Sequence, residues 1–173
     1  MLTEFLNMEL PDKCSVFLDE NNLRPGGTFN EEIKRSLHRS RVIVPIFSTA
    51  YFRSEWCKAE LDCVMRREFA LGRRTQNKPI GLIFPVKLHD GKYYPKEVQN
   101  ITYEDFSIFN HAAADSPFRQ SQDYLEFRKL VRQFAINLVE PIMNTPPWDA
   151  TFPELMDPGV QPDPIIIPQP RMF

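Results

Sequence analysis

The sequence has few cysteines and none of the spacings typical of zinc sites. Its three cysteines, Cys14, Cys57 and Cys63, are an odd number in 173 residues, and no two of them form a CxxC pair. Neither a disulfide framework nor a structural metal site is therefore expected. Two of the cysteines lie in a segment with helical periodicity, which indicates reduced thiols in a cytoplasmic protein.

The chain also lacks long apolar runs and a large net charge. No stretch approaches the roughly 18 apolar residues of a membrane span, and no basic segment followed by an apolar one opens the chain. The formal net charge of −2 argues against electrostatic capture of nucleic acid. We expect a soluble protein without membrane or direct nucleic-acid partners. Four local basic residues are interpreted as a solvated helix end: Arg66, Arg67, Arg73 and Arg74. The three histidines, His38, His89 and His111, are interpreted as surface residues.

Strand-like and helix-like segments alternate along the chain. The run "RVIVPIFS" (residues 41–48) is almost entirely apolar, as expected for a parallel strand covered on both faces. Ser54 is placed to cap a helix that stops near Gly72. This alternation predicts an α/β fold with a doubly wound parallel sheet. Further strands are expected at residues 14–20, 80–88 and 101–107, and further helices at 1–10, 29–37 and 122–143.

Proline accumulates at the end of the chain. Nine of the last 33 residues are prolines, so we predict that residues 144–173 form an extended tail after a domain of residues 1–143. Trp148, Phe152 and the run 165–167 are more apolar than a solvated linker requires. The tail is therefore a linker, a clamp that lies over the domain, or a peptide that docks to a partner protein.

Two segments converge on the expected ligand-binding edge of the sheet. In open parallel sheets, ligands bind beyond the carboxyl ends of the strands. The loop that follows Asp19 and the segment from Ser48 to Glu60 both lie at such ends. We therefore predict a site there.

The stretch "VFLDENNLRPGGTFNEEIKRSLHRSRVIVPIFSTAYFRSEWCKAEL" (residues 16–61) resembles the central part of a Toll/interleukin-1 receptor (TIR) domain. The resemblance covers roughly residues 14–143 and is more similar to bacterial and plant members than to animal receptor adaptors. It implies a flavodoxin-like sheet. The matching residues are Val16, Phe17, Leu18 and Asp19 of the strand expected at residues 14–20, then Leu23 and the glycine-containing loop, and after them Ile33, Ser40, Arg41, Ser48, Tyr51, Ser54, Trp56, Cys57, Glu60 and Leu61.

One departure from the family concerns the first strand. TIR domains normally begin with a strand that occupies the centre of the sheet, whereas Met1 falls inside the expected first helix. Unpaired backbone groups in a core cost on the order of 1–3 kcal/mol each. Three explanations are open: a misplaced start or truncation, a rearranged sheet, or substitution by another strand such as "DPIIIPQP" (residues 163–170).

The resemblance implies a chemistry as well as a fold. Many bacterial and plant TIR domains cleave the bond between nicotinamide and ribose in NAD+. The glutamate that the family requires, four residues after a tryptophan, corresponds to Glu60 after Trp56. A carboxylate suits this reaction because departure of neutral nicotinamide leaves a positively charged ribose. NAD+ would be a substrate, and no cofactor or metal is implied. The resemblance places further dinucleotide contacts at Asp19 and Phe29, and hydrogen-bonding hydroxyls at Ser48 and Ser54.

Two functions follow from the resemblance. The first is an NAD+ hydrolase or cyclase that acts as an assembly-activated effector in prokaryotic antiviral defence. The second is a non-enzymatic TIR scaffold. It would self-associate through the loop that commonly joins TIR domains and through the face of Arg66 and Arg67. A receiver domain would need an acidic cluster and a lysine that the sequence does not show. The loop that commonly joins TIR domains corresponds to Leu23, Arg24, Pro25, Gly26 and Gly27.

Overall fold

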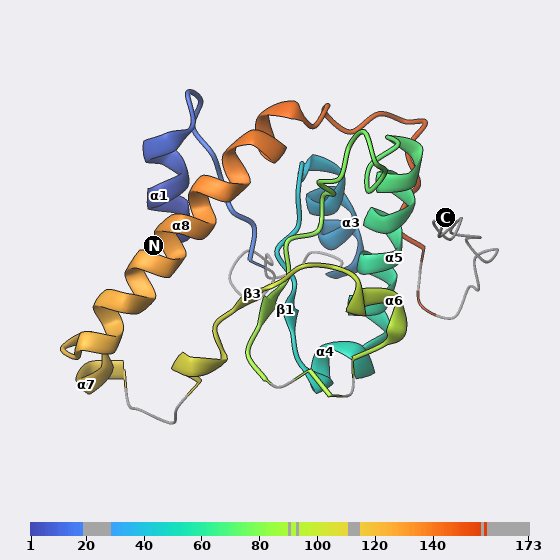
Figure 1. The fold of residues 1–173 in the computed structure, drawn as a ribbon. Helices are drawn as coiled ribbons and strands as arrows, with labels where there is room; N and C mark the ends of the chain where they lie inside the picture. Colours follow the sequence, from blue (N-terminus) through green and yellow to red (C-terminus); the bar gives the residue numbers. More distant parts are fainter. Residues whose placement is uncertain (19–28, 90, 93, 111–114, 157, 159–173) are drawn as a thin grey trace.

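The computed structural model describes residues 1–18, 29–89, 91–92, 94–110, 115–156 and 158 (Figure 1). The helices of this part are separated by short parallel strands and by extended segments. Their bounds are α1 Leu2–Glu9, α3 Phe29–Arg39, α4 Thr49–Arg53, α5 Glu55–Ala70, α6 Lys96–Gln99, η1 Ser107–Phe109, α7 Asp115–Arg119 and α8 Gln122–Asn144.

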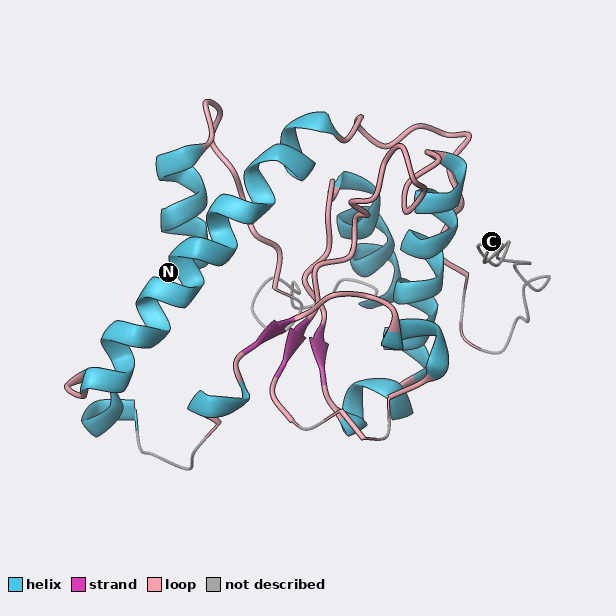
Figure 2. Ribbon diagram, in the orientation of Figure 1, coloured by secondary structure: helices cyan, strands magenta, loops and turns pink. Residues whose placement is uncertain are grey.

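The described strands form one parallel sheet in the order β1-β2-β3 (Figure 2), which confirms the predicted parallel α/β character. Strand β1 (Ile46–Phe47) pairs with β2 (Val86–Lys87), and β2 pairs with β3 (Glu104–Asp105). Each regular strand has only two residues. A proline directly precedes both β1 and β2, which limits these two strands. Pro45 and Pro85 have no N–H, but their carbonyls accept from Val86 N and Glu104 N at 2.9 Å.

Helices cover both faces of this sheet (Figure 1). Val42 and Val44 pack with the core that α1 and α8 form, whereas Ile43 and Phe47 pack with the core beneath α5. This alternation is the period of two of an extended strand. It explains most of the apolar run at residues 41–48, because both faces of the segment are covered except at Ile46, which is exposed.

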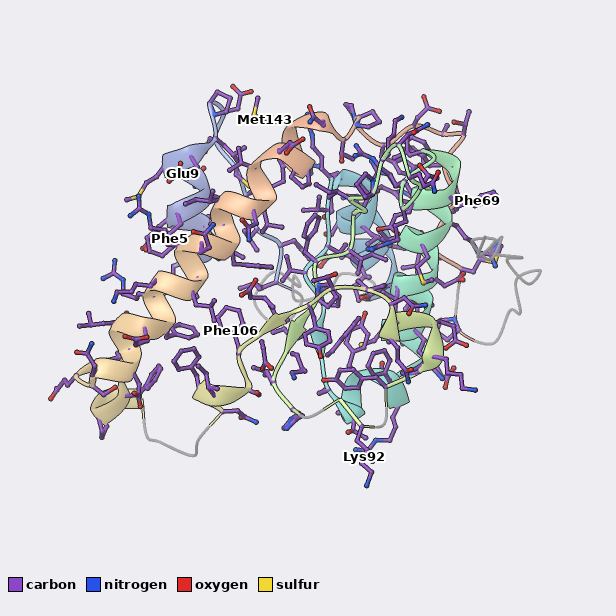
Figure 3. All side chains as sticks on the ribbon, viewed as in Figure 1. Phe5, Glu9, Phe69, Lys92, Phe106 and Met143 are labelled. Carbon is purple, nitrogen blue, oxygen red and sulfur yellow. The ribbon has the colours of Figure 1, made fainter. Side chains whose placement is uncertain are left out.

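Aromatic side chains fill the layer between the sheet and the α1/α8 pair. Phe5 from α1 and Phe106, which follows β3, are both buried (Figure 3). Phe106 meets Phe134 of α8 at a centroid distance of 6.4 Å and Phe127 at 5.7 Å, both edge to face. The helix predicted at residues 122–143 is therefore confirmed. Its buried residues recur at helical spacing along one face.

The strand predicted at residues 14–20 is wrong for its described part. Residues 14–18 belong to no strand, although Cys14 and Val16 pack against the α1/α8 core. Phe17 and Leu18 are exposed. Apolar alternation sets which side chains are buried, but a strand also needs a backbone ladder with a neighbouring strand. The five-stranded flavodoxin-like order and the absent first strand stay predictions.

Residues 145–156 continue beyond α8 and lie across α3 and α5 (Figure 1). Leu155 is 4% exposed in a cluster with Ile33 and Cys63. This part of the Pro-rich segment thus lies on the domain, while residues 159–173 lie outside the described part. The boundary at residue 144 stays a prediction. Within the described residues, no helix is both long enough and apolar enough to cross a membrane.

A buried carboxylate joins α5 to the segment that leads into β2. Glu68 is 4% exposed, and its oxygens accept from Arg74 Nε at 2.6 Å and from Arg74 Nη2 at 3.1 Å. The same carboxylate accepts from the backbone N–H groups of Leu82 and Ile83. Gly81 is required beside it, because a Cβ there would lie 2.7 Å from Arg74 Cζ. The prediction that Arg67 is solvated is wrong, because Arg67 is only 5% exposed. Arg74 is exposed, as predicted, although it also pairs with this carboxylate.

We expect Glu68→Gln to lower the free energy of unfolding by about 3 kcal/mol, because it leaves the Arg74 charge without its partner and turns an amide donor toward backbone donors. Urea unfolding followed by circular dichroism measures the change. Glu140→Gln, at an exposed position of α8, is the matched control and should change the stability by less than about 0.5 kcal/mol. Equal midpoints for the two variants would contradict a structural role of Glu68.

Candidate active site

Trp56 and Glu60 lie one turn apart on α5. Ser54 caps this helix, since its Oγ accepts from Cys57 N at 3.3 Å. The cap fixes where the first turn begins, and residues four apart then fall on the same side of the helix. Both side chains are half-buried. The structure thus brings the predicted catalytic residue and the predicted tryptophan together.

Ser48 lies directly after β1, at the carboxyl end of the sheet. Its Oγ accepts from Tyr51 N at 3.1 Å and caps the short helix α4. Ser54 ends α4 and begins α5. Both predicted binding serines therefore serve as helix caps. Because capping uses only an oxygen lone pair, each hydroxyl keeps its proton to donate.

Tyr51 links this segment to the Glu60 side of α5. Its Oη donates to Cys57 O at 3.1 Å. Burial raises the pKa of Tyr51 above its ordinary value of 10.0, and the charges of Cys57 and Glu60 raise it further. Tyr51 therefore stays a neutral phenol near Glu60. In the sequence Tyr51 supports only the family resemblance, and its closeness to Glu60 depends on the turn between α4 and α5.

Four aromatic rings meet at the carboxyl ends of β1 and β2. Phe52 lies 4.9 Å from Phe47 and 5.1 Å from Tyr94, and Tyr51 lies 5.5 Å from Phe47, measured between ring centroids. Tyr94 Oη donates to Phe47 O at 2.7 Å. Tyr94 comes from the loop between β2 and α6, so sequence reasoning did not include it. The only signal for it is an aromatic residue after a strand, which is weak.

Polar side chains at the carboxyl ends of β2 and β3 and just beyond them bind one another or the backbone. Lys87 and Asp105 form an ion pair of 2.6 Å across the two strands, and Asp105 also accepts from Ser107 Oγ at 2.6 Å. Asn110 donates to Leu88 O at 3.0 Å. Among the described residues, no three His, Cys, Asp or Glu side chains lie close enough to hold a metal ion.

Several predicted residues lie where the structure gives no account of their side chains. Phe29 is the first residue of α3, and its side chain is not described. The remaining ones lie outside the described residues, namely the predicted dinucleotide contact Asp19 and the assembly loop of Leu23, Arg24, Pro25, Gly26 and Gly27.

The histidine prediction holds only in part. His89 is exposed, as expected for a surface residue. His38 is instead half-buried and stacks on Trp148, with 4.3 Å between the ring centroids and 15° between the ring planes. A residue from the Pro-rich segment supplies this contact, so the position of His38 could not be read from its neighbours in the chain.

Taken together, the described residues place the Glu60 carboxylate one helical turn after the Trp56 indole and near the neutral, buried Tyr51 phenol, while Ser48 and Ser54 cap the two helices of the same segment. A carboxylate stabilises a positive charge that develops close to it. Each capping hydroxyl keeps one proton that it can donate to an acceptor.

Comparisons with known proteins agree in the family that they indicate. A family model described as a TIR domain matches residues 3–120. A probable 2′ cyclic ADP-D-ribose synthase of Brachypodium distachyon is 30% identical over 89 residues, which are 50% of this chain and 40% of that protein. An NAD(+) hydrolase of Paracoccus denitrificans is 34% identical over 55 residues, which are 32% of this chain and 18% of that protein.

The chain thus spans less than half of the length of either curated relative. No solved structure matches it.

The Tyr51 phenol should remain un-ionised where an ordinary tyrosine is half ionised, near pH 10, because burial disfavours the phenolate. The measurement is the absorbance at 295 nm of the wild type and of Tyr51→Phe between pH 8 and pH 11. We expect the two titration curves to coincide around pH 10. A difference that corresponds to half a tyrosinate at that pH would contradict the buried position of Tyr51.

Proposed function

Because this chain belongs to the TIR domain family, we propose that it cleaves the bond between nicotinamide and ribose in NAD+, with Glu60 as the catalytic carboxylate. The observation that carries the proposal is the position of Glu60, one turn after Trp56 on α5 and near the neutral Tyr51. The names of the two relatives, a cyclic ADP-ribose synthase and an NAD+ hydrolase, support the same reaction class.

The reaction begins with rupture of the C–N bond between ribose and nicotinamide. The bonding electrons leave with the ring nitrogen, so nicotinamide departs as a neutral molecule and the sugar becomes an oxocarbenium-like cation. The Glu60 carboxylate stabilises this cation electrostatically. A water molecule or a hydroxyl of the same ADP-ribose then attacks the cationic carbon and loses a proton, which gives a linear or a cyclic product.

The other predicted residues would hold the substrate. Trp56 offers an aromatic face one turn before Glu60, and the hydroxyls of Ser48 and Ser54 would donate to ribose or phosphate oxygens. Asp19 and Phe29 are proposed as further contacts to the dinucleotide. The proposal includes no cofactor or metal, since loss of a neutral leaving group needs neither.

We further propose that activity depends on self-association through the loop of residues 23–27. In this proposal the protein is a cytoplasmic effector of bacterial type in antiviral defence, switched on when its domains assemble. The scaffold alternative shares this assembly but lacks turnover. Arg67 does not favour the scaffold's suggested arginine face, because its side chain is buried.

Nicotinamide release from NAD+ tests the proposal. We expect release by concentrated protein, or under conditions that induce filaments, and a loss of about 100-fold or more in Glu60→Gln, which keeps the shape but removes the charge. Chromatographic quantification of nicotinamide and ADP-ribose gives the rates, and circular dichroism confirms that the variant is folded.

Glu55→Gln is the control, since Glu55 lies in the first turn of the same helix, is exposed and forms an ion pair with Lys58, three residues away. It should retain the wild-type rate. An unchanged rate in Glu60→Gln would remove Glu60 from the mechanism. No release by the wild type under any assembling condition would favour the scaffold.

A further inference from the structure

Residues 145–156, here called the strap, contact α3 and α5 through three large side chains. Trp148 stacks on His38 of α3. The ring of Phe152 lies 4.9 Å from Arg67 Cζ of α5, in cation–π geometry. Leu155 is buried with Ile33 of α3 and Cys63 of α5. The strap therefore joins two helices that are otherwise separate in the chain.

The buried end of the strap reaches the helical turn that carries Trp56. Trp56 and Ala59 pack against the cluster that Leu155 forms with Ile33 and Cys63. Cys63 Sγ donates to Pro153 O at 3.4 Å, which fixes the strap at the same point. Trp56 thus packs against a cluster that includes a residue 99 positions away in the chain. Removal of Leu155 would leave the inner side of the indole with fewer contacts.

Polar groups beneath the strap are only partly satisfied. Arg67 donates to Ser40 O at 2.8 Å and to Pro146 O at 2.9 Å. Its Nε is nevertheless buried without a hydrogen-bond partner within the described part of the chain, as are His38 Nε2 and Trp148 Nε1. Unpaired buried donors oppose closure, because water would satisfy them once the strap lifts. Near Leu155 the apolar contacts, with one weak hydrogen bond from Cys63, outweigh this penalty, so a loss of apolar contact there should release this end of the strap.

We propose that the strap is a reversible cover on α3 and α5, and that Leu155 is a positioning residue that holds Trp56 in place for substrate binding. The second half rests on the proposed function, whereas the first half does not. Release of the strap exposes Cys63 and frees Trp56, while Glu60 keeps its place on α5. Substrate binding should then weaken more than the chemical step.

The first experiment measures the reactivity of Cys63 in a Cys14→Ser/Cys57→Ser background, which leaves Cys63 as the single thiol. Burial raises the pKa of Cys63 to about 11, so the closed protein should react slowly with Ellman's reagent at pH 8. We expect Leu155→Ala to react at least tenfold faster, and Leu155→Met to restore slow labelling. Met156→Ala, at the exposed neighbouring position, should label like the parent protein.

Urea unfolding of each variant distinguishes local release from global unfolding. Faster labelling of Leu155→Ala at concentrations of urea well below its unfolding transition supports a local opening. Labelling no faster than that of Met156→Ala would overturn the strap proposal. So would labelling that rises only together with global unfolding.

The second experiment measures nicotinamide release by the same three variants with their natural cysteines. We expect Leu155→Ala to raise KM for NAD+ at least threefold and to change kcat by less than twofold, with recovery in Leu155→Met. A faster-labelling Leu155→Ala with unchanged KM would overturn the positioning role alone. If no form releases nicotinamide, the proposed function fails, and the strap is judged by its labelling rates.

Discussion

The carboxylate of Glu68 is the contact on which the geometry of the candidate site depends. It is buried in the last turn of α5, and it accepts from the backbone of Leu82 and Ile83, which lead into β2. The paired Arg74 balances its charge. A buried carboxylate is favourable only with such complete pairing. The contact sets how far α5 is displaced along the sheet, and therefore where Trp56 and Glu60 lie.

The opposite end of α5 is set by serine caps rather than by charge. Ser48 and Ser54 fix two successive helix starts, so the chain passes from β1 into α5 with little freedom. Between these two anchors the helical repeat assigns the faces: Leu61 and Val64 pack with the sheet, whereas Ala59 and Cys63 pack with α3. Glu60 falls on the border between the two faces. A border position explains how an ionisable side chain is half-buried without lying in either core.

Sequence patterns predicted those elements whose burial follows from local periodicity. The apolar run at residues 41–48 and the stripe on α8 are examples, because their periods alone indicate which faces are covered. Arg67 and His38 were misjudged for the opposite reason. Their partners, Pro146 and Trp148, lie 79 and 110 residues away, in a segment whose composition allows a clamp over the domain but does not indicate which helices it contacts. The closeness of Glu60 to Tyr51 likewise depends on the turn between α4 and α5, which hydrophobic periodicity does not predict.

The two ends of the strap are held by different forces. At the end of α8, Arg41 and Arg73 donate to Ile142 O and Asn144 O at 3.0 and 2.8 Å, and at the start of the strap Arg67 donates to Pro146 O at 2.9 Å. Carbonyls at the end of a helix lack intrahelical donors and carry partial negative charge, so arginines from three separate segments suit them well. At the far end, Leu155 is held by apolar packing, and Cys63 adds one weak hydrogen bond. Opening should therefore begin at Leu155 and stop at the arginines, which keeps α8 in place while the face around Trp56 is uncovered.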